Sequence, residues 1–79
     1  MEMQTIYVQL LDEGTKVYRP VPAIKIQDDV YELQGAELYD KEEEIWEFGP
    51  NSRVFVKEDC LGGEKVLIAY ELCSLSLFR

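Results

Sequence analysis

The residues that could do chemistry are concentrated in one short stretch of the chain, from Glu37 to Phe48. This stretch holds six acidic residues and a single base, Lys41, with two large aromatic residues among them. Carboxylates attract the lysine and arginine side chains of a partner, and aromatic rings add rigid contact area and cation–π contacts. We therefore predict an acidic, aromatic-flanked interaction surface formed by Glu37, Tyr39, Asp40, Glu42, Glu43, Glu44, Trp46 and Glu47.

Two other interpretations of the same stretch stay open. The plainer one is a solvated hairpin loop in which Tyr39 and Trp46 only cap the fold. The other is a calcium site, since Asp40, Glu42 and Glu44 offer oxygen ligands, but no glycine stands where a calcium loop needs its sharp turn.

One arginine, Arg19, lies in the extended part of the chain. Arg19 lies between Tyr18 and Pro20 in an acidic protein. We expect it to pair with a carboxylate across the sheet rather than to bind a ligand.

The chain lacks the residue types on which most catalytic and metal sites depend. It has no histidine, so a serine triad, a Cys–His pair and the commonest metal ligand are all excluded. Cys60 and Cys73 are not spaced as a metal-binding pair, and Gly62-Gly63 lacks the strand–helix setting of a phosphate loop. A catalytic carboxylate pair would need a concave site to raise one pKa. We predict no enzyme, no cofactor and no metal site.

The net charge of the chain indicates which classes of partner are favoured. The formal charge is −8 and the isoelectric point is near 4.3, which repels nucleic acid and anionic membranes and favours a basic protein. The same charge could serve solubility alone. No secretory signal and no apolar run of membrane-spanning length is visible, so we expect a cytoplasmic protein with free thiols, although a Cys60–Cys73 disulfide stays conceivable.

The elements that must position the acidic stretch are strands. Short β-branched and aromatic runs alternate with polar residues and are separated by turn signals. We expect strands over residues 5–11, 16–27, 30–33, 45–48, 53–58 and 65–71. The pattern predicts an all-β fold, a small five- or six-stranded antiparallel barrel or roll that is SH3-like, as a single domain over residues 1–79. The tail, residues 72–79, either extends the last strand or frays.

Two details of packing follow from the alternation. Pro20 and Pro22 cannot donate ladder hydrogen bonds, so their strand should be an edge there or should switch partners at a bend. We predict a core made of Ile6, Val8, Val17, Ile24, Ile26, Leu33, Trp46, Phe48, Val54, Val56, Val66 and Ile68.

Three segments carry a resemblance to known proteins. They read YVQLLDEGTKVYRPVPA, WEFGPNSRVFVKE and GGEKVLIA. In this order they resemble a recurrent type of small, uncharacterised bacterial protein, and the similarity extends from Ile6 to Glu71. The resemblance implies an SH3-like or similar small β-barrel that stands alone, and it transfers no catalytic or binding role to any residue.

Three functions remain for a fold of this kind. The first is a protein-interaction module acting through its acidic surface, for example an immunity or antitoxin-like inhibitor of a basic protein. The second is a nucleic-acid-binding barrel, which the scattered basic residues disfavour. The third is a structural subunit of a larger enzyme. The sequence decides neither the identity of a partner nor the oligomeric state.

Overall fold

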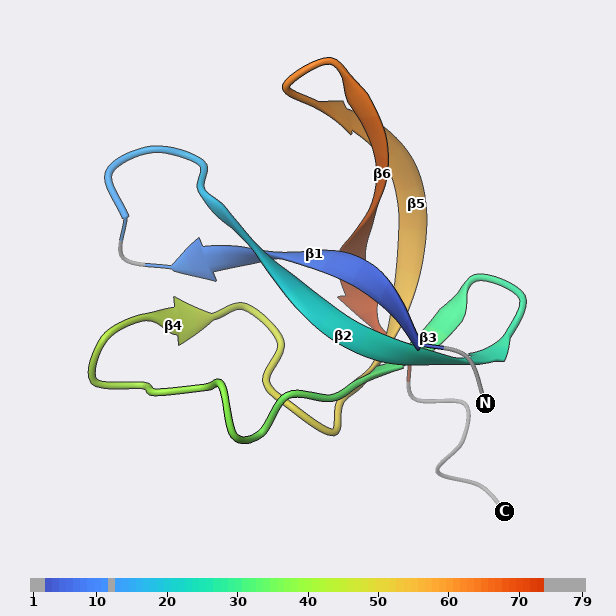
Figure 1. The fold of residues 1–79 in the computed structure, drawn as a ribbon, viewed down its shortest axis with the longest axis horizontal. Helices are drawn as coiled ribbons and strands as arrows, with labels where there is room; N and C mark the ends of the chain where they lie inside the picture. Colours follow the sequence, from blue (N-terminus) through green and yellow to red (C-terminus); the bar gives the residue numbers. More distant parts are fainter. Residues whose placement is uncertain (1–2, 12, 74–79) are drawn as a thin grey trace.

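The computed structural model describes residues 3–11 and 13–73, and within them the protein is built of strands and turns with no helix. Six strands were expected from the alternation, and six are present (Figure 1). Their bounds are β1 Met3–Leu11, β2 Tyr18–Gln27, β3 Val30–Leu33, β4 Ile45–Trp46, β5 Arg53–Leu61 and β6 Glu64–Leu72. The prediction of an all-β fold is therefore confirmed.

Five of the strands form a closed ring of hydrogen-bonded neighbours in the order β2, β3, β5, β6, β1, and β1 pairs again with β2. β4 lies outside this ring and pairs only with the end of β1. The ring closes where Ile6 pairs with Leu67 and Tyr7 pairs with Ile68, and this β1–β6 pairing is parallel. The expectation of antiparallel strands throughout is wrong at this point. A ring of five strands cannot alternate direction all the way round, so one pair must be parallel.

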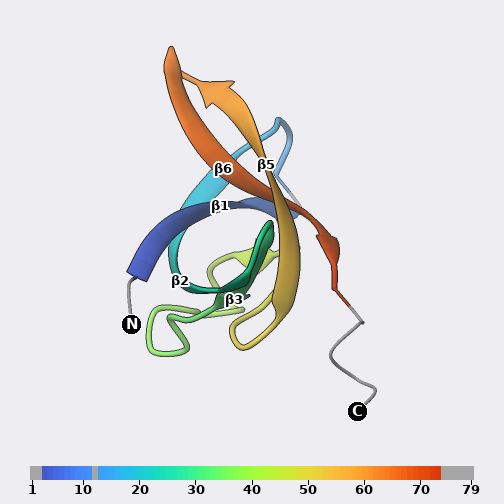
Figure 2. The same cartoon turned by 90° about the vertical axis from the view of Figure 1, so that its right-hand side faces the viewer.

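Two-residue turns connect two of the hairpins of the ring, β2–β3 and β5–β6. Asp28 and Asp29 join β2 to β3, and Asp29 takes a φ of 65°. Gly62 and Gly63 join β5 to β6 with φ values of 59° and 86°. Positive φ at both central residues defines the turn whose twist matches that of the flanking strands, and glycine adopts it without strain. The second hairpin projects from the ring as a two-stranded arm (Figures 1 and 2).

The two prolines of β2 lie where the sequence predicted a change of partner. Pro20 and Pro22 pair with Tyr7 and Thr5 of β1, and the ladder to β3 begins only at Ala23. The carbonyl of Pro22 accepts a hydrogen bond from the amide of Gln34 at 2.8 Å. At the prolines the strand therefore pairs with β1, and its other side is used only by the Pro22 carbonyl, so the missing N–H donors fall on the side away from β1.

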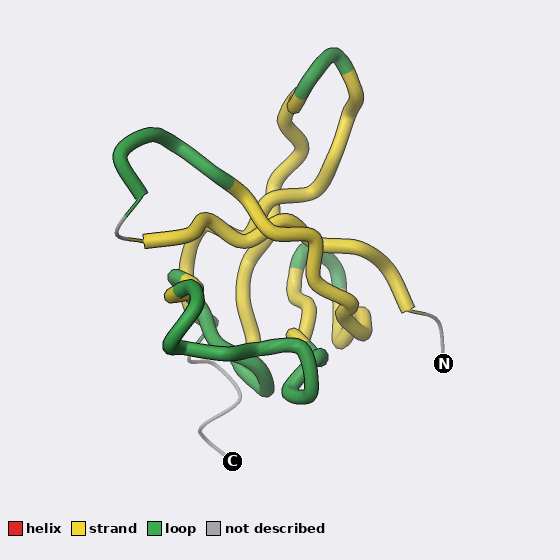
Figure 3. Tube along the Cα trace, turned by 60° about the vertical axis from the view of Figure 1, so that its left-hand side comes forward, coloured by secondary structure: helices red, strands yellow, loops and turns green. Residues whose placement is uncertain are grey.

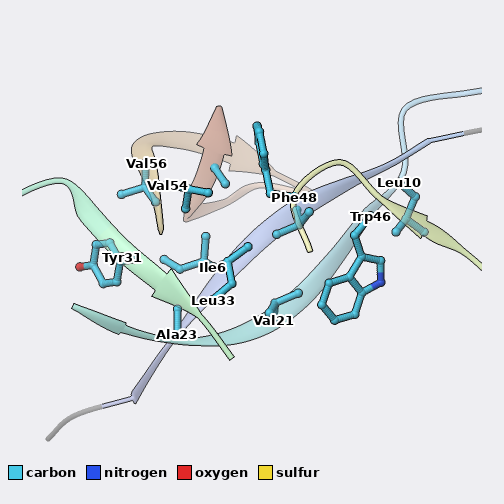
Figure 4. Packing of buried hydrophobic residues seen from close by; sticks show 12 residues of the cluster. Ile6, Leu10, Val21, Ala23, Tyr31, Leu33, Trp46, Phe48, Val54 and Val56 are labelled. Carbon is cyan, nitrogen blue, oxygen red and sulfur yellow. The ribbon is translucent and has the colours of Figure 1, made fainter. Parts of the chain in front are cut away.

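The core fills the inside of the ring. Figure 4 shows Trp46 and Leu10 at one end of the buried cluster and Tyr31 at the other. Ile6, Val8, Val21, Leu33 and Val54 are fully buried in it. The cluster consists of Ile6, Val8, Leu10, Val21, Ala23, Tyr31, Leu33, Trp46, Phe48, Val54, Val56 and Ala69.

The predicted core is correct on most strands and wrong on β2. Ile24 is only half-buried and Ile26 is 40% exposed, whereas Val21 and Ala23 have no exposed surface. Side chains of a strand alternate between faces, so burying Val21 and Ala23 turns both isoleucines outward. The sequence suggested the reverse because the isoleucines alternate with the polar residues Lys25 and Gln27.

The remaining core predictions divide in two. Val17 and Val66 are half-buried rather than buried. The others are buried as expected: Ile6, Val8, Leu33, Trp46, Phe48, Val54, Val56 and Ile68. At the end of the described chain, Leu72 belongs to β6 and the amide of Cys73 donates to the carbonyl of Arg53 at 2.8 Å. Leu72 thus extends β6 one residue beyond the expected end at residue 71, and residues 74–79 of the tail lie outside the described residues.

The burial of Val21 and the exposure of Ile26 on β2 lead to a direct prediction. Val21→Ala should lower the free energy of unfolding by about 2–3 kcal/mol, because it removes two buried methyl groups and leaves a cavity. Ile26→Ala removes more carbon but from an exposed side chain, so it should cost less than about 1 kcal/mol. Urea denaturation of both variants checks the order. A larger loss for Ile26→Ala would mean that β2 faces the other way.

Candidate functional site

The acidic segment, residues 37–47, lies in the long connection between β3 and β5. This connection is drawn in green below the strands in Figure 3 and contains the short strand β4. β4 holds it to β1 through the pairs Leu10–Trp46 and Leu11–Ile45. The amide of Glu47 also donates to the carbonyl of Gln9 at 2.8 Å. The second half of the acidic segment is therefore fixed to the end of β1.

Asp40 organises the centre of the segment. Its carbonyl accepts hydrogen bonds from the amides of Glu43 at 2.9 Å and Glu44 at 3.0 Å, and its side-chain Oδ1 accepts one from the amide of Glu42 at 3.0 Å. A short aspartate side chain that caps the following amides is a common way to start such a turn. The turn leaves Glu42 and Glu43 exposed and makes Glu44 half-buried.

Glu44 contacts two other side chains instead of solvent. One carboxylate oxygen, Oε1, accepts a hydrogen bond from Trp46 Nε1 at 2.8 Å and lies 3.4 Å from Arg19 Nε. Arg19 Nε is buried and makes no hydrogen bond of good geometry among the described residues, so the second contact is mainly an attraction between charges. Arg19 thus pairs with a carboxylate as expected, but with one in this segment rather than across the sheet. Glu44 serves to position the segment.

The two aromatic residues of the segment face inward. Trp46 is 3% exposed and belongs to the core cluster, and Tyr39 is half-buried and packs against that cluster. Their ring centroids are 4.6 Å apart with the planes at 50°. A tilted pair at this distance stabilises the fold beyond the area it buries. The aromatic edge that the sequence suggested is therefore part of the core, as in the plainer interpretation of the segment.

The remaining predicted residues are exposed, but they do not form one patch. Glu42 and Glu43 lie side by side after Asp40. Glu37 lies in a separate turn in which the amide of Leu38 donates to the carbonyl of Gly35 at 2.8 Å. The exposed members of the predicted surface are Glu37, Asp40, Glu42, Glu43 and Glu47.

A hollow of about 220 Å³ gathers part of these acids against apolar side chains, and we call it the acidic hollow. Leu11 and Ile45 contribute apolar surface and are 40% and 38% exposed. Four carboxylates face one lysine in the lining, which consists of Leu11, Glu13, Lys41, Glu42, Glu43, Glu44 and Ile45. An apolar wall beside carboxylates suits a lysine or arginine side chain, which buries its stem and keeps its charged end at the acids.

Sequence reasoning missed three residues of the acidic hollow. Leu11 and Ile45 were read only as strand residues, and Glu13 only as part of a turn. The sequence of β1 did indicate that Leu11 faces outward. The buried residues Ile6, Val8 and Leu10 are even-numbered, so the side chain of Leu11 lies on the opposite face of the strand. Its partner across the ladder, Ile45, must face the same side.

Other chemistry was sought among the described residues. In residues 3–11 and 13–73, no three cysteine or acidic side chains are grouped so that they could hold a metal ion. Cys60 is an exposed free thiol and Cys73 a half-buried one. The part of the chain that the structure describes contains no helix long and apolar enough to cross a membrane.

No protein-family model, no curated protein and no solved structure matches the chain. The resemblance to small bacterial proteins that the sequence suggested therefore stays a prediction.

The contacts of Glu44 predict how the segment responds to mutation. Glu44→Ala leaves the buried indole N–H of Trp46 without an acceptor and should lower the free energy of unfolding by about 1–3 kcal/mol. Glu44→Gln keeps an acceptor for Trp46 but loses the attraction to Arg19, so it should cost less than the alanine variant.

Glu43→Ala is the matched control, because Glu43 is exposed and should change stability by no more than about 0.5 kcal/mol. Unfolding can be followed by the fluorescence of Trp46, the single tryptophan. Equal stability of the Glu43 and Glu44 variants would contradict the structural role of Glu44.

Proposed function

We propose that the protein is a non-catalytic interaction module that binds a basic partner protein through the acidic hollow. The observation that carries the proposal is that two exposed apolar residues, Leu11 and Ile45, lie in one concave site with three exposed carboxylates, those of Glu13, Glu42 and Glu43. Acids alone would attract any cation, but the apolar wall adds contact with the stem of a long basic side chain. The partner presents a lysine or arginine at the centre of its interface.

The charge of the whole molecule supports the same proposal. A net charge of −8 attracts a basic protein from a distance and speeds the encounter. It also works against the alternative of a nucleic-acid-binding barrel, because an acidic surface repels the phosphate backbone. An immunity or antitoxin-like inhibitor that covers a basic protein is the concrete form that we favour.

Two finer features belong to the proposal. We propose that the ring of strands is an SH3-like small barrel, supported by its small size, its long connection between β3 and β5 and its largely antiparallel pairing. We also propose a cytoplasmic setting, supported by the two free thiols of Cys60 and Cys73.

Charge reversal at the acidic hollow tests the proposal. The double variant Glu42→Lys/Glu43→Lys reverses two exposed acids of the lining and should leave the fold intact. Once a basic protein has been captured with the wild-type chain and identified, the variant should bind it roughly 5- to 150-fold more weakly, which corresponds to about 1–3 kcal/mol. Calorimetric titration at several salt concentrations measures the loss.

The control variant changes the net charge equally without touching the hollow. Glu37→Lys/Glu47→Lys reverses two exposed acids of the same segment that do not line it. This variant should lose only the part of the affinity that disappears at high salt. If both double variants weaken binding to the same extent, the acidic hollow is not the contact and the charges act only at long range.

A further inference from the structure

A second hollow lies at the other end of β1. It has a volume of about 360 Å³ and is lined by the beginning of β1 and by the base of the β5–β6 arm, and we call it the arm groove. Its walls are formed by Gln4, Thr5, Tyr7, Glu58, Lys65, Val66 and Leu67. None of these residues lines the acidic hollow.

The arm groove exists because the ring closes over so short a distance. β1 and β6 pair only through Ile6–Leu67 and Tyr7–Ile68, and they separate on the N-terminal side of both strands. The arm then leaves the ring, as Figures 1 and 2 show. Between the arm and the first residues of β1, two strand edges face one hollow without pairing to each other.

The wall formed by β6 presents unpaired backbone groups to the groove. In an antiparallel ladder, residues alternate between directing their N–H and C=O groups to the partner strand and directing them away from it. Leu61 and Glu64 flank the two-residue turn and face each other, so Lys65 directs its backbone groups away from β5. Lys65 lies in the groove wall, and its N–H and C=O therefore point to the groove.

The wall formed by β1 also contributes an unpaired donor, at Thr5. The amide of Leu10 donates to the carbonyl of Val17 of the neighbouring segment at 2.8 Å, which fixes the alternation along β1. Even-numbered residues of β1 thus face β2, and odd-numbered residues face the opposite edge. Tyr7 meets β6 there, but the N–H of Thr5, two residues earlier, faces the groove.

The far edge of the arm is protected, unlike the edge in the groove. Cys60 lies opposite Lys65 in the ladder, and its backbone groups point away from β6. The side chain of Asp59 accepts the hydrogen bond of the Cys60 amide at 2.8 Å. A side chain that satisfies an exposed amide blocks the addition of another strand at that edge. Among the described residues, the Lys65 amide has no such side-chain acceptor.

We propose that the arm groove binds an extended, uncharged segment of a partner protein, which adds a strand beside Lys65 of β6. The partner's backbone would pair with the free N–H and C=O groups, which is the recognition mode of added strands. Its side chains would meet apolar Val66 and Leu67 and the hydroxyls of Thr5 and Tyr7. One acid, Glu58, and one base, Lys65, balance each other in the lining, so the site selects no net charge.

A second copy of this chain is a poorer occupant than a partner segment. Two molecules with a net charge of −8 repel each other, and the arm itself carries Glu58, Asp59 and Glu64. The proposal is independent of the acidic hollow, since it concerns other residues and backbone rather than charge.

A short neutral peptide serves as the probe. Acetyl-Thr-Val-Thr-Val-Thr-amide has no charge and favours the extended form. Added at millimolar concentration to the isotopically labelled full chain, it should shift the amide signals of Lys65 and Thr5 and slow hydrogen exchange at Lys65. The same peptide with alternate amides N-methylated cannot pair and should produce neither effect.

Two proline variants, at the paired residues Lys65 and Cys60 of the arm, distinguish binding at the groove edge from binding at the far edge. Lys65→Pro removes only a groove-facing N–H and should weaken peptide binding about tenfold or more, as judged by the shifts at Thr5. Cys60→Pro removes an N–H at the opposite edge and should leave binding unchanged. Lys65→Gln keeps the N–H and loses the charge, so it should also bind.

Three outcomes would overturn the proposal. The first is the absence of shifts at Lys65 and Thr5 with the wild-type chain. The second is equal binding by Lys65→Pro and Cys60→Pro, which would exclude a role for the groove backbone. The third is protection of the Lys65 amide that rises with protein concentration and without peptide, which would identify a second copy as the occupant.

Discussion

The short parallel contact between β1 and β6 is the constraint on which the rest of the structure depends. Two residue pairs, Ile6–Leu67 and Tyr7–Ile68, close the ring around its core. Because the contact is so short, the same edge of β1 remains available on both sides of it. One end of that edge holds β4 and with it the acidic segment, and the other end opens into the arm groove. Both proposed contact surfaces are therefore consequences of a single closure.

The sequence predicted the strands well because each has a local signal. Alternation marked β1 and β5, and glycines or aspartates marked the hairpin turns. Which face of β2 is buried could not be predicted from the local sequence. Val21 and Ala23 are small, and only their position over the core makes them point inward. Ile24 and Ile26 point outward as a result. The parallel closure was equally hidden, because it follows from the exclusion of β4 from the ring.

The candidate site was predicted in part for a similar reason. A run of acids is visible in any sequence, so the exposed Glu42 and Glu43 were found. The role of Glu44 depends on the fold, because Trp46 is only two residues away in sequence but Arg19 comes from the distant strand β2. The sequence suggested that Trp46 contacts a partner, but its burial makes it part of the core. Glu44 fixes the position of Trp46 by accepting the hydrogen bond of the indole N–H. The segment is thereby ordered before any partner arrives, which lowers the entropy lost on binding.

The open edge in the arm groove also bears on how the protein behaves in concentrated solution. Unpaired strand edges invite association between chains, and here charge repulsion is the main barrier to it. That repulsion disappears near the isoelectric point of about 4.3. Colloidal stability of this protein is thus tied to the ionisation of its carboxylates, and mild acidification should promote association between chains.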